Sequence, residues 1–148
     1  MKTIYLIRHA QSTGQQPDGD LTELGKKQAQ DLIARLSYIA PDGAYSSPYL
    51  RALDTIRPYC DRVGLDIQTD PDLAERQLKP FDLWLPFDEL MHHLRLSFEN
   101  WDYKMKGGES LNDTKGRALR GLGKIVQSNL NARLLPLTAI LSPRCWAP

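Results

Sequence analysis

The alternation of strand-like and helix-like patterns in the first 70 residues constrains the fold more than any other feature. Thr3 to Ile7 is a short, nearly continuous apolar run, typical of a strand covered on both faces. Leu21 to Leu36 repeats apolar residues at helical spacing, and residues 43–47 (GAYSS) predict a second strand. A helix over residues 48–60 and a strand within GLDIQTD, residues 64–70, follow. This order predicts an α/β fold with a mostly parallel sheet.

The second half is expected to complete the same domain. Residues 111–130 predict a long helix with Ser110 as its N-cap, and residues 134–141 (LLPLTAIL) predict another buried strand. Between them, residues 76–106 read as a helical lid or insertion, and residues 142–148 as an aberrant tail. The prediction is one domain over residues 1–148, an α/β three-layer sandwich with a mostly parallel central sheet flanked by helices, incomplete at the C-terminus.

Three local predictions refine this picture. Ser47 followed by Pro48 predicts a hydroxyl N-cap with proline at the first helical position. Pro58 predicts a kink or a break, because proline removes one helical hydrogen bond. The large aromatic residues of the lid are expected to pack in the core or the lid and to shape a leaving-group pocket; they are Trp84, Phe87, Phe98 and Trp101. The adjacent His92 and His93 point different ways on a helix and are expected to be surface or lid residues.

Composition narrows the class of protein. The chain has 148 residues, 41% hydrophobic and 25% charged, with a net charge of +1, as expected of a soluble globular domain without a general affinity for nucleic acid. Cys60 and Cys145 lack metal-ligand spacing and are expected to be reduced, non-catalytic thiols. The N-terminus lacks signal-peptide character and no apolar run reaches membrane-spanning length, so a cytoplasmic location without membrane contact is expected. The oligomeric state stays open.

Charged residues follow the predicted strands where ligands sit in open α/β sheets. Arg8 and His9 end the first strand, Arg51 lies in the first turn of the second helix, and Glu75 follows the third strand. Two guanidinium groups beside a helix N-terminus suit the oxygens of a phosphate group. A neutral imidazole among them is a nucleophile available near neutral pH, and a carboxyl group with a raised pKa is a proton donor.

Five segments in order resemble the histidine phosphatase superfamily, also called the phosphoglycerate-mutase-like family. LIRHAQST resembles its RHG motif, LTELGKKQA its LTxxGxxQA, and SSPYLRALDT its SSPxxRAxxT. LAER resembles the segment that supplies the acid, and GGES a later motif. The ordered set is more specific than a lone Arg-His pair.

This resemblance implies a role for each matching residue. His9 would be the nucleophile that forms a phosphohistidine, and Glu75 the general acid that later helps water to attack it. The implied phosphate-binding residues are Arg8, Ser12, Gln15 and Arg51. No metal or cofactor is implied, because fixed cations stabilise the transferring group.

The chain departs from the family pattern in three places. Ala10 replaces the commonest glycine, and Gln15 stands where many members have asparagine. The long insertions of glycolytic mutases are not recognisable around Arg76 to Trp101, which favours a phosphatase over a mutase.

The second histidine expected of the family is missing. It should follow the last strand in a Ser-His-Gly segment, but Ser142 is followed by Pro143, Arg144, Cys145 and Trp146. One C inserted after the first codon of AGC CAC GGT GCT GGG changes Ser-His-Gly-Ala-Gly into Ser-Pro-Arg-Cys-Trp. We therefore interpret the chain as a frameshifted or truncated family member whose second histidine would have stood at Pro143.

The predicted function is hydrolysis of phosphate monoesters through a phosphohistidine, weakened or lost with the second histidine. The expected partner is a small phosphorylated substrate or inorganic phosphate. Two alternatives stay open: phosphoryl transfer of the phosphoglycerate mutase type, and a catalytically dead protein that binds phosphate esters.

Overall fold

The centre of the molecule is a four-stranded sheet in the order β1-β4-β2-β3. A computed structural model describes residues 3–129 and 131–137. The strands are β1 (Thr3–Arg8), β2 (Gly43–Ser46), β3 (Ile67–Thr69) and β4 (Ala132–Leu137). β1 pairs with β4 from Thr3 opposite Ala132 to Arg8 opposite Leu137, and all three pairings are parallel. The predicted α/β fold with a parallel sheet is confirmed.

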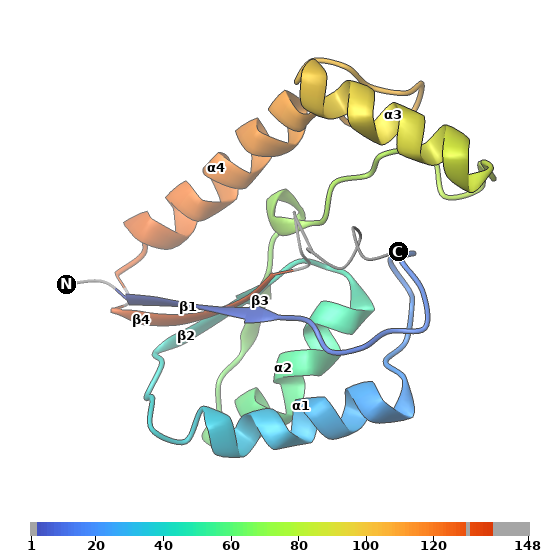
Figure 1. Ribbon diagram of the computed structural model, residues 1–148. Helices are drawn as coiled ribbons and strands as arrows, with labels where there is room; N and C mark the ends of the chain where they lie inside the picture. The colour runs from blue at the N-terminus through green and yellow to red at the C-terminus, as the bar shows by residue number, and fades with distance from the viewer. Residues whose placement is uncertain (1–2, 130, 138–148) are drawn as a thin grey trace.

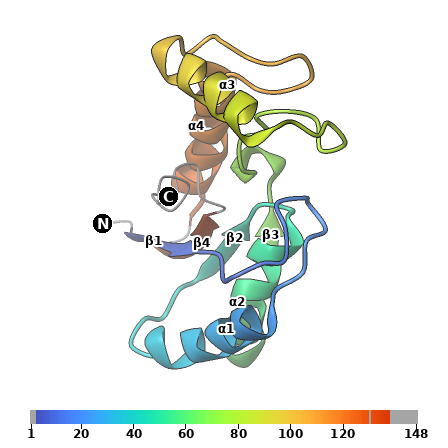
Figure 2. The same ribbon diagram turned by 45° about the vertical axis from the view of Figure 1, so that its right-hand side comes forward.

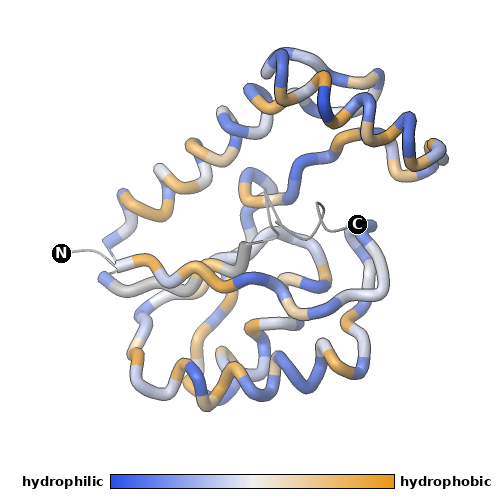
Figure 3. The backbone as a smooth tube through the Cα atoms, in the orientation of Figure 1, coloured by the Kyte–Doolittle hydropathy of each residue, from blue (hydrophilic) through white to orange (hydrophobic). Residues whose placement is uncertain are grey.

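Helices α1 (Glu23–Arg35) and α2 (Leu50–Val63) cover one face of this sheet (Figure 1). Their hydrophobic and hydrophilic residues alternate along each helix (Figure 3), as expected when one side packs and the other meets solvent. A buried core joins this face of the sheet to both helices, and its members are Ile7, Leu36, Ile39, Ala44, Ile56, Tyr59 and Cys60. Burial raises the pKa of the Cys60 thiol to about 11, so this cysteine is a protonated packing residue at neutral pH.

The opposite face is covered by α4 (Leu111–Gln127) and the short 3-10 helix η1 (Pro71–Leu73). Tyr45, Leu73, Ile125 and Leu135 form the core on this side. The predicted N-cap of α4 is confirmed: the Ser110 hydroxyl accepts from the Asp113 main-chain N–H, and the Asp113 carboxylate accepts from the Ser110 N–H. Helices on both faces of the sheet make the predicted three layers.

The lid contains one helix, α3 (Phe87–Glu99), beyond the ends at which the strands finish (Figures 1 and 2). The predicted core packing of its aromatic residues is wrong, since Trp84, Phe87, Phe98 and Trp101 are all exposed, with Trp84 80% exposed. The reason is that α3 does not lie on the sheet. His92 is exposed as predicted, whereas His93 is partly buried and contacts the Tyr103 hydroxyl group.

Two predictions about α2 are also wrong. The helix begins at Leu50 with Tyr49 as its N-cap, and Ser47 is buried without capping it. The Leu50 N–H donates instead to the Pro17 carbonyl at 2.8 Å, so a neighbouring loop satisfies this helix end. Of the kink or break predicted at Pro58, the break is wrong: Pro58 lies inside an uninterrupted helix, because packing between the sheet and α1 outweighs one lost hydrogen bond.

The last predicted strand is confirmed over its described part, with β4 beginning two residues earlier than expected, at Ala132. Residues 138–141 of that prediction, and the tail of residues 142–148 with Pro143, Arg144 and Cys145, lie outside the described residues. In the part of the chain that the structure describes, no helix is both long enough and apolar enough to span a membrane.

Candidate active site

His9 lies immediately after β1 and is oriented by the main chain. Its Nδ1 is 2.7 Å from the Ala10 carbonyl oxygen. A carbonyl only accepts, so this hydrogen bond places the proton of a neutral ring on Nδ1 and leaves a lone pair on Nε2. The Ala10 N–H donates to the buried Thr55 Oγ1 at 2.9 Å, which ties the His9 segment to α2. In this tautomer, Nε2 is the ring nitrogen of His9 with a free lone pair.

Arg51 is the most deeply buried charged residue that the structure describes. In the first turn of α2, its side chain is 0% exposed. Its Nη1 donates to the Gln15 and Gln16 carbonyls at 3.1 and 3.0 Å, and its Nη2 to Glu75 Oε2 at 2.8 Å. Nε has no hydrogen-bond partner among the described residues. The guanidinium therefore joins the loop after β1, helix α2 and the segment after η1.

Glu75 follows η1 and points its carboxylate at Arg51. Its side chain is 26% exposed, so the acid lies between the buried guanidinium and solvent. The Thr55 hydroxyl donates to the Arg51 carbonyl at 2.6 Å, so one short path connects Glu75 and Arg51 to the His9 segment. The structure thus pairs Arg51 with Glu75 and connects both to the main chain next to His9.

The Tyr49 ring packs against the guanidinium group of Arg51. The guanidinium carbon lies 4.6 Å from the centre of this ring, which is cation–π geometry. Burial raises the pKa of the Tyr49 phenol, and the nearby positive charge of Arg51 opposes this shift. The phenol is therefore a neutral support at physiological pH.

The other predicted phosphate ligands have different positions. Arg8 is exposed at the end of β1. The Ser12 hydroxyl donates to the Gly14 carbonyl at 3.1 Å, within the loop that Arg51 holds. Gln15 is exposed and contributes its main-chain carbonyl to Arg51, so the expected contact of its side-chain amide with phosphate stays a prediction.

Three residues that sequence reasoning did not single out belong to this site. Thr55 links His9 to Arg51, and Glu109 and Arg117 form an ion pair at 2.7 Å beside Glu75. Thr55 ends the SSPYLRALDT motif and Glu109 lies in GGES. The motifs were therefore the available signal, although neither assigned these two residues a role.

Electrostatics fix the state of Glu109. Burial raises the pKa of its carboxyl group, but the hydrogen bonds from Arg117 and from the Gln77 N–H together lower the pKa by more. The net pKa of Glu109 is therefore below the ordinary value. Glu109 is therefore ionised at neutral pH. Within residues 3–129 and 131–137, no group of three or more histidine, cysteine or acidic side chains is arranged to hold a metal ion.

Comparison with known proteins defines the class of protein to which this chain belongs. The profile of the histidine phosphatase superfamily (branch 1) matches residues 4–138. The chain belongs to this superfamily.

Particular relatives include both mutases and phosphatases. A 2,3-bisphosphoglycerate-dependent phosphoglycerate mutase from Rhizobium etli is 36% identical over 137 residues, covering 78% of this chain and 62% of the relative. The protein of the same name from Thermoplasma acidophilum is 32% identical over 124 residues, covering 72% and 62%. The chain thus spans less than two thirds of the length of these relatives.

Two solved structures share the fold with similar TM-scores and sequence identities. YhfR of Bacillus stearothermophilus matches with a TM-score of 0.76 at 26% identity, over 94% of this chain and 74% of that one. A mycobacterial glucosyl-3-phosphoglycerate phosphatase in complex with inorganic phosphate matches with a TM-score of 0.74 at 27% identity, over 89% and 70%.

Proposed function

We propose that this protein is a phosphomonoesterase that transfers the phosphoryl group of a small substrate to His9 and then to water. The observation that carries the proposal is the Arg51 cluster: a fully buried guanidinium in the first turn of α2, paired with Glu75 at 2.8 Å and linked through Thr55 to the His9 segment. A fixed cation, an oriented imidazole and a carboxyl group are the parts that phosphoryl transfer through histidine needs.

The first step forms the phosphohistidine. Glu75, displaced from Arg51, first takes the proton of the monoanionic phosphate ester. Nε2 of His9 then attacks phosphorus while the bond from phosphorus to the ester oxygen breaks, and Glu75 gives that proton to the departing oxygen. Arg8 and Arg51 balance the charge of the phosphoryl oxygens. An oxygen reaches Nη2 of Arg51 by taking the place of the Glu75 carboxylate, which frees Glu75 to act as the acid.

The second step returns the enzyme to its starting state. Water attacks phosphorus, the bond from phosphorus to Nε2 breaks, and Glu75 accepts the proton of the water. Inorganic phosphate leaves with that proton, and the Glu75 carboxylate pairs with Arg51 again. The groups named here supply the charge and the proton transfers of both steps.

This chain is expected to be slow because it lacks the second histidine. Losing one donor to the transferring group typically costs on the order of 10² to 10³ in rate. Reading the gene across the codons of Ser142 to Trp146 tests the frameshift interpretation: a Ser-His-Gly frame is expected there, and its absence would overturn that interpretation.

Mutase activity is the second candidate, because relatives such as that from Rhizobium etli are named phosphoglycerate mutases. The products discriminate between the two. A phosphatase releases inorganic phosphate from a phosphorylated glycerate, whereas a mutase yields the isomer with the phosphoryl group on the other oxygen.

The test is turnover of p-nitrophenyl phosphate by the unchanged chain, by His9→Ala and by His92→Ala. His92 is an exposed residue of α3 and serves as the matched control. Activity is expected to vanish in His9→Ala and to persist in His92→Ala. Equal rates in all three proteins would exclude His9 as the nucleophile, and phosphate binding with no turnover in any of them would indicate a binding protein.

A further inference from the structure

Arg117 of α4 divides its guanidinium group between Glu109 and the segment that carries Glu75. It donates five hydrogen bonds, two to the Glu109 carboxylate at 2.7 and 2.8 Å and three to main-chain carbonyls. Those carbonyls belong to Asp72, Ala74 and Glu75, at 3.1, 2.6 and 3.3 Å. The Arg117 side chain is only 13% exposed, so these bonds are largely shielded from water.

Glu109 fixes the other side of the same segment. Its Oε2 accepts from the Gln77 N–H at 3.1 Å, and its own N–H donates to the Gln77 carbonyl at 2.7 Å. Its carbonyl accepts from Arg76 Nε at 3.0 Å. The main chain is therefore held both before and after Glu75.

Gly108 permits this close approach. A Cβ atom at this position would lie 2.2 Å from the Leu78 carbonyl oxygen, which no side chain allows. The GGES turn thus packs its backbone directly on the segment that follows Glu75. The contact is specific in shape as well as in charge.

We propose that the Glu109–Arg117 pair is a positioning device that aims the Glu75 carboxyl group at the leaving oxygen of the substrate. This inference rests on the proposed function. In the free protein, Arg51 holds the Glu75 side chain. Once a phosphoryl oxygen occupies Arg51, that hold is lost, and the main-chain clamp from Arg117 and Glu109 decides where the carboxyl group lies.

Misplacing the acid changes the kinetics in a way that a mere loss of stability does not. An activated leaving group such as p-nitrophenolate departs with little help, whereas phenolate, whose conjugate acid has a pKa of about 10, depends on the proton. A misplaced Glu75 therefore slows phenyl phosphate more than p-nitrophenyl phosphate. The ratio of the two rates in one sample is independent of the folded fraction.

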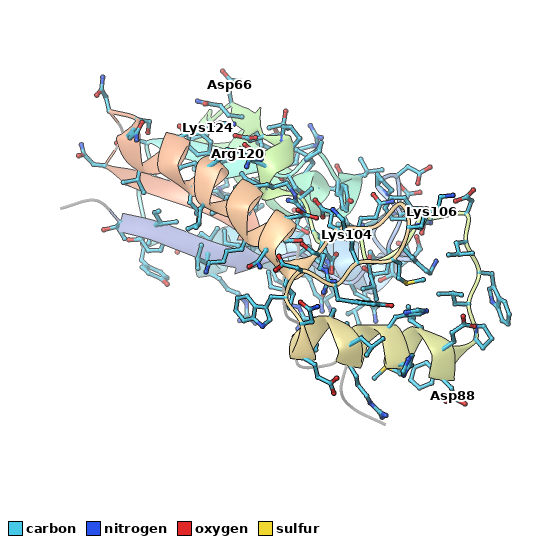
Figure 4. All side chains as sticks on the ribbon, turned by 90° about the horizontal axis from the view of Figure 1, so that it is seen from above. Asp66, Asp88, Lys104, Lys106, Arg120 and Lys124 are labelled. Carbon is cyan, nitrogen blue, oxygen red and sulfur yellow. The ribbon has the colours of Figure 1, made fainter. Side chains whose placement is uncertain are left out.

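The variants are Arg117→Gln, Arg117→Lys and Glu109→Gln, with Arg120→Gln as the matched control. Arg120 lies one turn along α4 (Figure 4), is 64% exposed and pairs with the Asp72 carboxylate at 3.1 Å. Among the described residues, none of the hydrogen bonds that Arg120 donates goes to the Glu75 main chain. Each rate ratio is measured in the unchanged chain and again in a Glu75→Gln background.

The ratio of phenyl to p-nitrophenyl phosphate turnover is expected to fall about tenfold in Arg117→Gln, a part of the ~10² to 10⁴ that a general acid contributes. Arg117→Lys and Glu109→Gln should show smaller falls, and Arg120→Gln none. In the Glu75→Gln background, Arg117→Gln should cause no further change. An unchanged ratio in Arg117→Gln, or an equal fall in that background, would overturn the positioning role. Turnover that survives His9→Ala would instead overturn the proposed function.

Discussion

Replacing Thr55 with valine tests the connection on which the geometry of the site depends. The Thr55 hydroxyl accepts from the Ala10 N–H at 2.9 Å, donates to the Arg51 carbonyl at 2.6 Å, and is buried. Valine keeps the shape but leaves the Ala10 N–H without its acceptor, which costs about 1–3 kcal/mol in the free energy of unfolding. For a chain of this size the Tm falls by about 2–4 °C per kcal/mol.

In Thr55→Val, the loss of the hydrogen bond to the Arg51 carbonyl costs less stability. This carbonyl lies within α2 and still accepts from the main-chain N–H one turn later. Thr114→Val is therefore the matched control. Thr114 is equally buried and donates to the carbonyl one turn earlier in the same way, to Ser110 at 2.9 Å. The difference between the two variants isolates the Ala10 hydrogen bond.

The assay is urea unfolding of both variants together with turnover of p-nitrophenyl phosphate. Thr55→Val is expected to be the less stable by about 1–3 kcal/mol and to be slower, because the segment that carries His9 is loosened. Thr55→Ser, which keeps the hydroxyl, should retain more activity. Equal stability of Thr55→Val and Thr114→Val, with unchanged turnover, would refute the role assigned to this hydrogen bond.

Three further predictions concern charge and titration. Glu75→Gln should bind inorganic phosphate about tenfold more tightly by calorimetry, about 1.4 kcal/mol, because a carboxylate no longer competes for Arg51; weaker binding would contradict the exchange. Cys60, in a Cys145→Ser background, should react with iodoacetamide at pH 8 only after unfolding, since burial raises the pKa of its thiol to about 11. Hydrogen bonds from Lys104 and Ser110 lower the pKa of Asp113 to about 2, below its value of about 3.9 in the unfolded chain. The stability that Asp113 contributes is therefore present above about pH 4 and is lost as the pH falls toward 2. Lys104→Ala should flatten that part of the curve of unfolding free energy against pH.

The sequence predicted the layers of this fold because each one leaves a local pattern. The apolar run at Thr3 to Ile7 and the Ser110 N-cap both depend on residues close together in the chain. The start of α2 was missed because the Leu50 N–H is satisfied by Pro17, a contact between distant segments. Continuity through Pro58 was missed for a similar reason, since packing outside the helix maintains it.

In the candidate site, too, the residues near local patterns were predictable and those that depend on distant contacts were not. His9, Arg51 and Glu75 were predicted as site residues because they follow strands or open a helix, where ligands gather in α/β folds. The positioning role proposed for Glu109 and Arg117 could not be read from sequence, because it depends on which carbonyls of the segment around Glu75 lie against α4 in the fold. The aromatic residues of the lid, such as Trp84, were expected to be buried because large aromatic side chains usually are. They are exposed because of where the lid lies in the fold, which the sequence pattern does not give.

The most direct test of the account is to identify the residue that carries the phosphoryl group. The chain is incubated with a phosphomonoester, quenched in alkali, in which phosphohistidine is stable, and mapped by mass spectrometry. The account predicts a phosphoryl group on His9, present with the unchanged chain and absent with His9→Ala. Release of inorganic phosphate with the label on another residue, or with no label on His9 at any time during turnover, would contradict it.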